Sequence, residues 1–269
     1  MTTTKIKKLN PFIINYAGTK YKESIETFQN DDLDFNKYNS FVEPFGGSFG
    51  FSRYIYMKLN KPTDKKFIIY DNDEELIAFY NHVKGMTQKE CEELHNKYNE
   101  LIDTYTAEEW TTKGKKLIKE VIPTIKDKYL KIMFDKNMIG GRFTKKIKKK
   151  FNPDWFEMFK YCTFIYMDVT DEKNLNSIKR KHDKKDVLIY LDPPYLNTCN
   201  SFYESTMSDY SEIIINFFVN KSKNNVLFVH ERNFLLKYIL NKYIYKSINK
   251  IFQSTKRTTI QDIYMKYKV

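Results

Sequence analysis

The sequence has few of the residues from which disulfide-rich and metal-containing proteins are built. It contains three cysteines and four histidines, and none of them shows the spacing of a metal-binding cluster. Three scattered cysteines also exclude a disulfide framework of the kind found in small secreted proteins. We therefore expect no metal site, and an intracellular, reducing location.

Long apolar segments are missing as well. No run of 18 apolar residues occurs, and residues 1–10 are polar and basic without an apolar core behind them. The sequence therefore predicts neither a membrane-spanning helix nor a secretory signal peptide, and we expect no membrane partner.

Acidic residues are too few to balance the basic ones. The 269 residues include 46 Lys and Arg against 34 Asp and Glu, which gives a formal net charge of +12. This excess favours an anionic partner, and nucleic acid leads because aromatic residues, 16% of the chain, offer stacking surfaces. A biased coding composition rich in Lys, Asn, Ile and Tyr is the alternative interpretation.

One stretch, residues 186–195, combines an apolar run with a polar ending. Residues 187–191 predict a buried, parallel strand, and Pro193 stops regular pairing because proline has no N–H to donate. Asp192 is therefore expected at the carboxyl edge of a sheet, where open α/β folds bind their ligands. The paired prolines restrict the backbone around this carboxylate and the Tyr195 ring. A strand that enters a tight turn is the structural alternative.

Two earlier segments repeat the pattern of a strand followed by ligand-binding residues. Residues 41–43 predict a short strand that enters a glycine-rich turn, and residues 67–70 predict a second strand that ends in Asp71. An acidic residue at this position binds ribose hydroxyls in nucleotide-binding α/β folds. The alternative for Asp71 is a helix N-cap, a role that Asn72 or Asp73 can also fill.

The remaining segments complete an α/β pattern. The last two apolar runs are expected to form an antiparallel pair that closes the sheet. This order of strands and helices is typical of an α/β fold. The further predicted strands are residues 164–167, 187–191, 225–229, 243–252 and 258–268, and the predicted helices outside the central region are residues 21–28 and about 208–219.

The central region breaks this alternation and is expected to be an inserted helical subdomain at residues 85–160. Thr87 to Glu90 has the pattern of a capping box that begins a helix. Further helices are expected at about residues 107–119 and 125–134. The basic run at residues 145–150 suits contact with phosphate groups, and a solvated charged loop is the alternative. Residues 1–84 and 161–269 would then form the α/β domain.

Four motifs in this order resemble the Dam-type DNA adenine-N6 methyltransferases. They are Asn15–Lys20, Phe41–Gly50, Tyr70–Asn72 and Asp192–Tyr195. The last is the Asp-Pro-Pro-Tyr tetrad of the family, matched at every position, and the resemblance spans about residues 13–269.

The resemblance implies a doubly wound, mostly parallel, Rossmann-like sheet, with residues 1–84 and 161–269 as the catalytic domain. It also implies an enzyme that methylates N6 of adenine in double-stranded DNA. The Asp192 carboxylate and the Pro193 carbonyl are expected to accept the amino hydrogens of a flipped base, while the Tyr195 ring stacks on it. The expected catalytic residues are Asp192, Pro193, Pro194 and Tyr195. Methylation of RNA adenine or of cytosine N4, and a catalytically silent nucleic-acid-binding subunit, remain alternatives.

By the same resemblance, S-adenosylmethionine (S-adenosyl-L-methionine) is the cofactor. Tyr16 and Lys20 are expected at its methionine end, and Asp71 on its ribose hydroxyls. Val169 stands where the family usually has an aromatic residue. The expected cofactor-binding residues are Tyr16, Lys20, Phe45, Gly46, Gly47, Asp71, Asp168, Val169 and Asp171.

The DNA-recognition pattern of the family is shortened to residues 137–144, so the recognition sequence is left open. The end of the predicted fifth strand also departs from the family, because residues 229–233 lack its Ser-Asn pair, whereas residues 262–264 resemble its closing segment. The expected DNA-binding residues are Arg142, Phe143, Lys145, Lys146 and Lys148.

Overall fold

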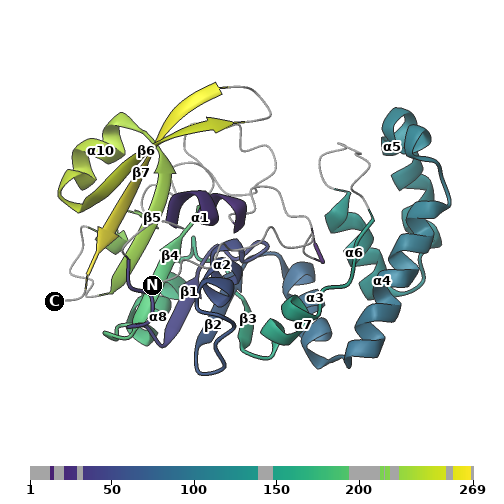
Figure 1. The fold of residues 1–269 in the computed structure, drawn as a ribbon, viewed down its shortest axis with the longest axis horizontal. Coiled ribbons are helices and arrows are strands. Elements are labelled where there is room, and N and C mark those ends of the chain that lie inside the picture. Colours follow the sequence, from purple (N-terminus) through teal and green to yellow (C-terminus); the bar gives the residue numbers. More distant parts are fainter. Residues whose placement is uncertain are drawn as a thin grey trace. The chain divides into compact units, whose positions relative to one another are not determined.

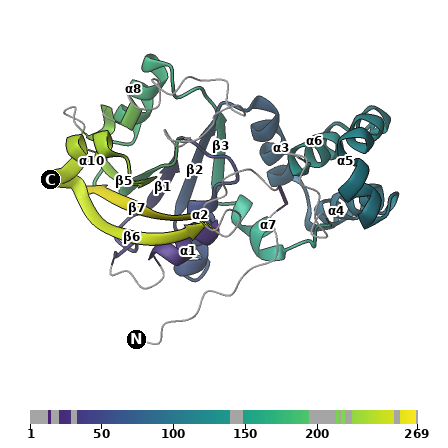
Figure 2. The same ribbon diagram turned by 90° about the horizontal axis from the view of Figure 1, so that it is seen from above.

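A computed structural model gives the fold of the chain (Figures 1 and 2). It describes residues 13–14, 21–28, 33–138, 148–193, 213–214, 216–218, 224–252 and 257–267. Their contacts divide the chain into two compact units. Unit 1 comprises residues 1–29, 47–61 and 73–166, and unit 2 comprises residues 30–46, 62–72 and 167–269.

The described residues form an α/β fold with a mostly parallel sheet, which confirms this part of the prediction. Seven strands follow the order β3-β2-β1-β4-β5-β7-β6. They are β1 (Ser40–Glu43), β2 (Lys66–Asp71), β3 (Cys162–Tyr166), β4 (Val187–Leu191), β5 (Asn225–Glu231), β6 (Ile244–Phe252) and β7 (Arg257–Lys266). All of them except β3 belong to unit 2.

Strand β1 of unit 2 lies between two parallel neighbours. Val42 is in register with Ile68 of β2 on one side and with Ile189 of β4 on the other. Every residue of β4 is buried, as its continuous apolar sequence predicts for a parallel strand covered on both faces. Strand β5 extends the parallel set, since it pairs in parallel with β4.

The chain order of these parallel strands reverses between β1 and β4. From β1 the chain proceeds to β2 on one side, whereas β4 and then β5 lie on the other side. In doubly wound sheets such a switch point opens a crevice at the carboxyl ends of the two strands, and ligands bind there. Residues that follow β1 and β4 are therefore the first candidates for a site in unit 2.

The two last strands form the antiparallel pair that the sequence predicts. β7 pairs antiparallel with both β5 and β6, and Figure 2 shows β6 and β7 running side by side. The rings of Phe228 and Tyr264 stack across the β5–β7 pair, with centroids 5.5 Å apart. This stacking adds side-chain packing to the main-chain pairing.

Two short helices of unit 2 were not predicted from the sequence. They are α8 (Glu172–Lys181) and α10 (Phe234–Leu240). Helix α8 buries only Leu175 and Ile178, so its apolar pattern is weak, and α10 has only seven residues. Each begins at a side-chain cap, Asp171 for α8 and Asn233 for α10.

Unit 1 is mainly helical. Helices α3 to α6 form one group in both views (Figures 1 and 2). Its helices are α1 (Tyr21–Phe28), α2 (Gly50–Lys58), α3 (Glu74–Gly85), α4 (Gln88–Asp103), α5 (Ala107–Val121), α6 (Lys128–Asn137) and α7 (Pro153–Phe159), with a 3-10 turn, η1 (Ile122–Thr124). None of the helices in the described ranges has the length and apolar character needed to span a membrane.

The local signals for these helices have mixed outcomes. The predicted capping box at Thr87 and Glu90 is present and begins α4, and Thr106 and Glu109 form a second one. The predicted start of a helix at residue 125 is wrong, because η1 precedes it and the Asp127 side chain caps α6 two residues later. The predicted boundaries of an inserted subdomain at residues 85–160 stay a prediction.

Aromatic side chains form much of the core of unit 1. The Phe49 ring packs edge-on against Tyr80 and Phe159, with centroids 5.2 and 5.6 Å apart. Phe164 of β3 lies against the same three rings. This cluster joins α3, α7 and β3 to the residue that begins α2, so the position of the Phe49 backbone is fixed by packing.

Candidate cofactor and catalytic site

Acidic residues stand at the carboxyl ends of the parallel strands of unit 2. β1 ends at Glu43, which is 2% exposed, and β2 ends at Asp71, which is 7% exposed. Asp192 follows the last residue of β4 and is half-buried. Because these strands are parallel neighbours, the three carboxylates share one edge of the sheet. The edge includes the switch point between β1 and β4, where a ligand is expected.

Gly46 brings the loop after β1 against the end of β2. Its N–H donates a hydrogen bond of 2.8 Å to the Tyr70 carbonyl. A Cβ at this position would lie 2.3 Å from Ile69 Cγ2 and 3.0 Å from the Tyr70 oxygen, and 3.7 Å from Asp71 Oδ2. Glycine is therefore required here for lack of space, and its backbone lies beside the Asp71 carboxylate.

The alternative role predicted for Asp71, a helix N-cap, is taken by another residue. The Asp73 carboxylate accepts the Leu76 N–H at 3.0 Å and so caps α3. Lys136 also donates to Asp73, at 2.6 Å. In unit 2 the backbone of Asp71 is held by the Met167 N–H, which donates to its carbonyl at 2.9 Å. The Asp71 side chain is thus buried at the sheet edge without a capping role.

The three predicted cofactor residues after β3 lie in a tight turn of unit 2. The Asp168 carboxylate accepts the N–H and the hydroxyl of Thr170, at 2.8 and 2.7 Å. The Asp171 carboxylate accepts the Asn174 N–H at 2.9 Å and caps α8. Val169 is buried between these two exposed acids. The capping role of Asp171 was missed, although an Asp before a polar helix is the usual signal for it.

The catalytic tetrad lies only partly within the described residues. Asp192 and Pro193 follow β4, and Pro193 is buried. The predicted site residues that lie outside the described ranges are Tyr16, Lys20, Arg142, Phe143, Lys145, Lys146, Pro194 and Tyr195. Of the predicted DNA-binding residues, Lys148 is therefore the one that can be placed. It is exposed and forms an ion pair of 2.5 Å with Asp103, also exposed, so this contact contributes little to stability.

Unit 1 contains the second half of the glycine-rich loop, which begins α2. Gly47 has a φ of 46° and Phe49 a φ of 40°, so a bulky residue occupies the left-handed region. The Tyr80 hydroxyl donates to the Gly47 carbonyl at 2.9 Å. Within the described residues, no side-chain hydrogen bond from Phe49, the N-cap residue, caps α2. Strain of this kind is stored at functional sites, and sequence reasoning missed it at Phe49.

The strand end that departs from the family pattern is stabilised by ion pairing within unit 2. Arg232 donates to both carboxylate oxygens of Asp262, at 3.0 and 2.8 Å, and the Ser247 hydroxyl donates to the same group at 2.6 Å. Burial of Asp262 opposes its ionisation, but these hydrogen bonds hold its pKa below the ordinary value. The network joins β5, β6 and β7, so Arg232 has a structural role here.

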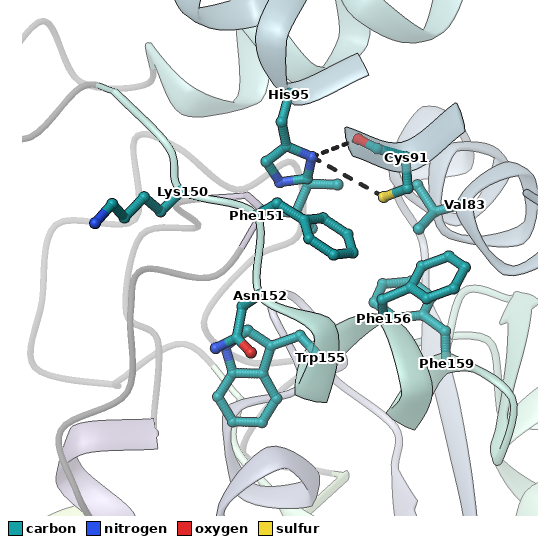
Figure 3. A pocket seen from close by; sticks show the side chains of 10 residues that line it. Val83, Cys91, His95, Lys150, Phe151, Asn152, Trp155, Phe156 and Phe159 are labelled. Carbon is teal, nitrogen blue, oxygen red and sulfur yellow. Dashed lines mark hydrogen bonds between the residues drawn. The ribbon is translucent and has the colours of Figure 1, made fainter. Parts of the chain in front are cut away.

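Unit 1 also contains a small pocket, in which the rings of His95 and Phe151 meet edge to face, with centroids 5.5 Å apart (Figure 3). His95 Nδ1 lies 2.8 Å from the Cys91 carbonyl, and burial lowers the pKa of this histidine. Burial also raises the pKa of the Cys91 thiol to about 12, so the pair is not an activated nucleophile. A volume of about 20 Å³ suits one water rather than a nucleotide.

No model of a protein family matches the chain, and no curated protein matches it. The fold defines an α/β protein whose mostly parallel sheet has a switch point between β1 and β4.

Proposed function

We propose that the chain is an S-adenosylmethionine-dependent DNA adenine-N6 methyltransferase. The observation that carries the proposal is the position of Asp192 directly after the wholly buried, parallel strand β4, beside the switch point. A carboxylate at this edge, followed by a buried proline, is what the resemblance of the Asp-Pro-Pro-Tyr tetrad leads us to expect.

The loop after β1 and the end of β2 fit the cofactor. Ile69 and the Tyr70 carbonyl leave no room for a Cβ at Gly46, so the backbone of the loop lies directly against the end of β2. The buried Asp71 carboxylate beside it can accept the two hydroxyls of a ribose. S-adenosylmethionine, when bound, supplies an electrophilic methyl group on a sulfonium sulfur.

Asp192 and Pro193 can activate the amine of the target base. The exocyclic nitrogen of adenine is a poor nucleophile, because its lone pair is delocalised into the ring. The Asp192 carboxylate accepts one amino hydrogen and the Pro193 carbonyl accepts the other, which favours a lone pair localised on nitrogen. The methylated nitrogen then carries one proton in excess, and the Asp192 carboxylate is the group of the motif that can accept it.

The DNA partner is supported by the charge of the chain. Removing the base from the duplex costs about a few kcal/mol, and stacking on an aromatic ring recovers about 1–3 kcal/mol. A formal charge of +12 favours contact with the phosphate backbone and thereby offsets more of this cost.

The proposal is tested by incubating the purified chain with labelled S-adenosylmethionine and adenine-containing duplexes. We expect label on adenine N6, and its loss in Asp192→Ala. The matched control is Asp64→Ala, an exposed acid before the amino end of β2, which should retain activity. Absence of label in the wild type, or equal label in Asp192→Ala, would contradict the proposal.

Two further measurements separate the alternatives. Digestion of the products to nucleosides distinguishes N6-methyladenine from N4-methylcytosine, and RNA substrates test the preference for DNA. Calorimetry with S-adenosylmethionine tests the catalytically silent alternative, since a subunit that only binds nucleic acid needs no affinity for the cofactor. Asp71→Asn should weaken this binding, because the carboxylate is the expected acceptor for the ribose hydroxyls.

A further inference from the structure

Helix α10 of unit 2 presents a large apolar surface to solvent. Phe234 is 87% exposed, Leu235 61% and Tyr238 79%. Residues four apart lie on the same face of a helix, so the rings of Phe234 and Tyr238 are neighbours, and Leu235 adjoins them. The helix packs against the core through Leu236 and Leu240. A single exposed apolar residue is ordinary, but two aromatic rings and a leucine side by side indicate a surface that binds a partner.

The chain around this surface is basic. From residue 232 to residue 261 the sequence contains seven basic residues and no acidic one. Asp262, the next acid in the sequence, is 0% exposed and is bound by Arg232, so it does not neutralise the surface. Lys237 of α10 is half-buried, and Lys242 in the 3-10 turn η2 (Asn241–Tyr243) is exposed. An anionic partner is therefore favoured, whereas a second copy of the same basic face would be repelled.

Aromatic and basic residues alternate along this segment. Lys237 precedes Tyr238, and Lys242 precedes Tyr243. The Lys242 ammonium lies 4.9 Å from the centre of the Tyr243 ring, and this ring packs against Phe218 with centroids 5.2 Å apart. Rings interleaved with cations are typical of surfaces that bind single-stranded nucleic acid, because bases stack on the rings and phosphates contact the cations.

The start of α10 lies at the edge of the sheet that carries the candidate site of unit 2. Its cap, Asn233, comes two residues after β5 ends at Glu231. β5 pairs in parallel with β4, and the residue after β4 is Asp192. In both views α10 lies at the end of the sheet where β5, β6 and β7 are (Figures 1 and 2). A strand bound along α10 would therefore reach the carboxyl edge of β5, next to that of β4.

We propose that α10 and η2 form a surface for single-stranded nucleic acid. Unpaired bases stack on Phe234 and Tyr238, and Lys237 and Lys242 contact the phosphate groups. An anionic membrane suits the surface less well, because binding to a bilayer scales with the apolar area inserted, and this seven-residue helix already places two of its leucines in the core. The inference goes beyond the proposed methyl transfer, since it involves neither Asp192 nor the cofactor.

Fluorescence anisotropy with a labelled single strand of about 16 nucleotides measures binding by the full chain, without S-adenosylmethionine. We expect Tyr238→Leu to weaken binding at least about fivefold, because it removes a ring and keeps an apolar side chain. Tyr238→Trp keeps a stacking surface and should bind like the wild type. The matched control is Leu235→Ala, which removes apolar area from the same face but no ring, and should leave binding unchanged. Binding of the corresponding duplex should not respond to Tyr238→Leu, because its bases stack on one another.

The salt dependence of binding tests the two lysines. Lys237→Gln and Lys242→Gln should each reduce the slope of the logarithm of the binding constant against that of the salt concentration by about 0.7, the value for one phosphate contact of a single strand. The control is Lys66→Gln, at the exposed amino end of β2 and thus on the opposite edge of the sheet, which should keep the wild-type slope. Wild-type slopes in both of the other variants would contradict the phosphate contacts.

Three results would overturn the proposal. They are no binding of the single strand by the wild type, equal binding by Tyr238→Leu and the wild type, and equal losses in Leu235→Ala and Tyr238→Leu, which indicate a general apolar surface. Vesicles of phosphatidylserine and phosphatidylcholine, and sedimentation of the chain alone, then identify the occupant: vesicle binding or a dimer that Leu235→Ala abolishes assigns a membrane or a second copy. Methyl transfer is measured separately, and its absence alongside intact single-strand binding would contradict the proposed function and leave this surface in place.

Discussion

Replacing Lys149 by Met should stabilise the protein, and the gain should depend on pH in a defined way. The amine has an ordinary pKa of 10.5, which applies to the unfolded chain, and a pKa of about 7 in the folded one. Between these values the unfolded chain binds more protons, so the stability of the wild type rises with pH. Below pH 7 both states are protonated, and this contribution no longer changes.

The magnitude follows from the two pKa values. With about 1.36 kcal/mol for each pKa unit, titration of Lys149 destabilises the folded wild type by at most about 4 kcal/mol at pH 7 and about 2 kcal/mol at pH 9. Lys149→Met has no titrating amine at this position. The stability gap between the variant and the wild type should therefore narrow by about 2 kcal/mol from pH 7 to pH 9.

Urea unfolding, followed by circular dichroism in chloride buffers without phosphate, measures this gap. Comparing variant with wild type at each pH cancels the titration of all other groups, including the buried tyrosines. Lys150→Met, at the exposed neighbouring position, should show no change of the gap with pH. A gap between Lys149→Met and wild type that is the same at both pH values would refute the burial of a charged lysine.

Three other changes have outcomes that stability measurements can check. Gly46→Ala places a Cβ 2.3 Å from Ile69 Cγ2 and should lower the free energy of unfolding in urea by about 1–3 kcal/mol. It should also weaken S-adenosylmethionine binding in calorimetry. Gly85→Ala is the control and should be close to neutral, because nothing lies within 4 Å of its Cβ. Asp262→Asn leaves Arg232 without its carboxylate and should lower the free energy of unfolding by about 1–3 kcal/mol in the same assay. A variant whose free energy of unfolding at high salt equals that of the wild type would contradict this. Burial lowers the pKa of His182 to about 4 from 6.5, so stability should fall as the pH drops from 6.5 to 4, and His182→Gln should flatten this part of the pH profile.

The strands could be predicted well because their signals are local. Residues 187–191 are all apolar, and the structure buries all of them as β4. The antiparallel tail was also predicted, since β-rich runs separated by a polar turn rarely have another solution. Helices α8 and α10 could not be predicted in the same way, because too few of their residues are buried to give a helical period.

The residues of the candidate site were predictable in identity but not in role. The sequence indicates that Asp71 and Asp171 both follow strands, yet it cannot distinguish a buried carboxylate from a helix cap. The structure buries Asp71 beside Gly46 and leaves Asp171 exposed as the cap of α8. The difference depends on the packing of β1 against β2, which joins residues far apart in the sequence.

Lys149 could not be separated from its neighbours by any local signal. Within the run of lysines at residues 148–150 the side chains are identical, and a solvated loop explains all of them equally well. Asn99 decides which one is turned inward, and it is 50 residues away in the chain. Burial of a charge is therefore a property of the tertiary structure alone.

The positions where the chain departs from local rules share one physical feature. Phe49 adopts a φ of 40°, Gly46 leaves no room for a Cβ, and Lys149 buries an amine without a partner in the described residues. A natural domain is stable by only about 5–15 kcal/mol, so a burden of about 4 kcal/mol at one residue is a large fraction of the total. Substitutions that relieve a local conflict of this size are easily found. We therefore expect such conflicts to persist only where function requires them.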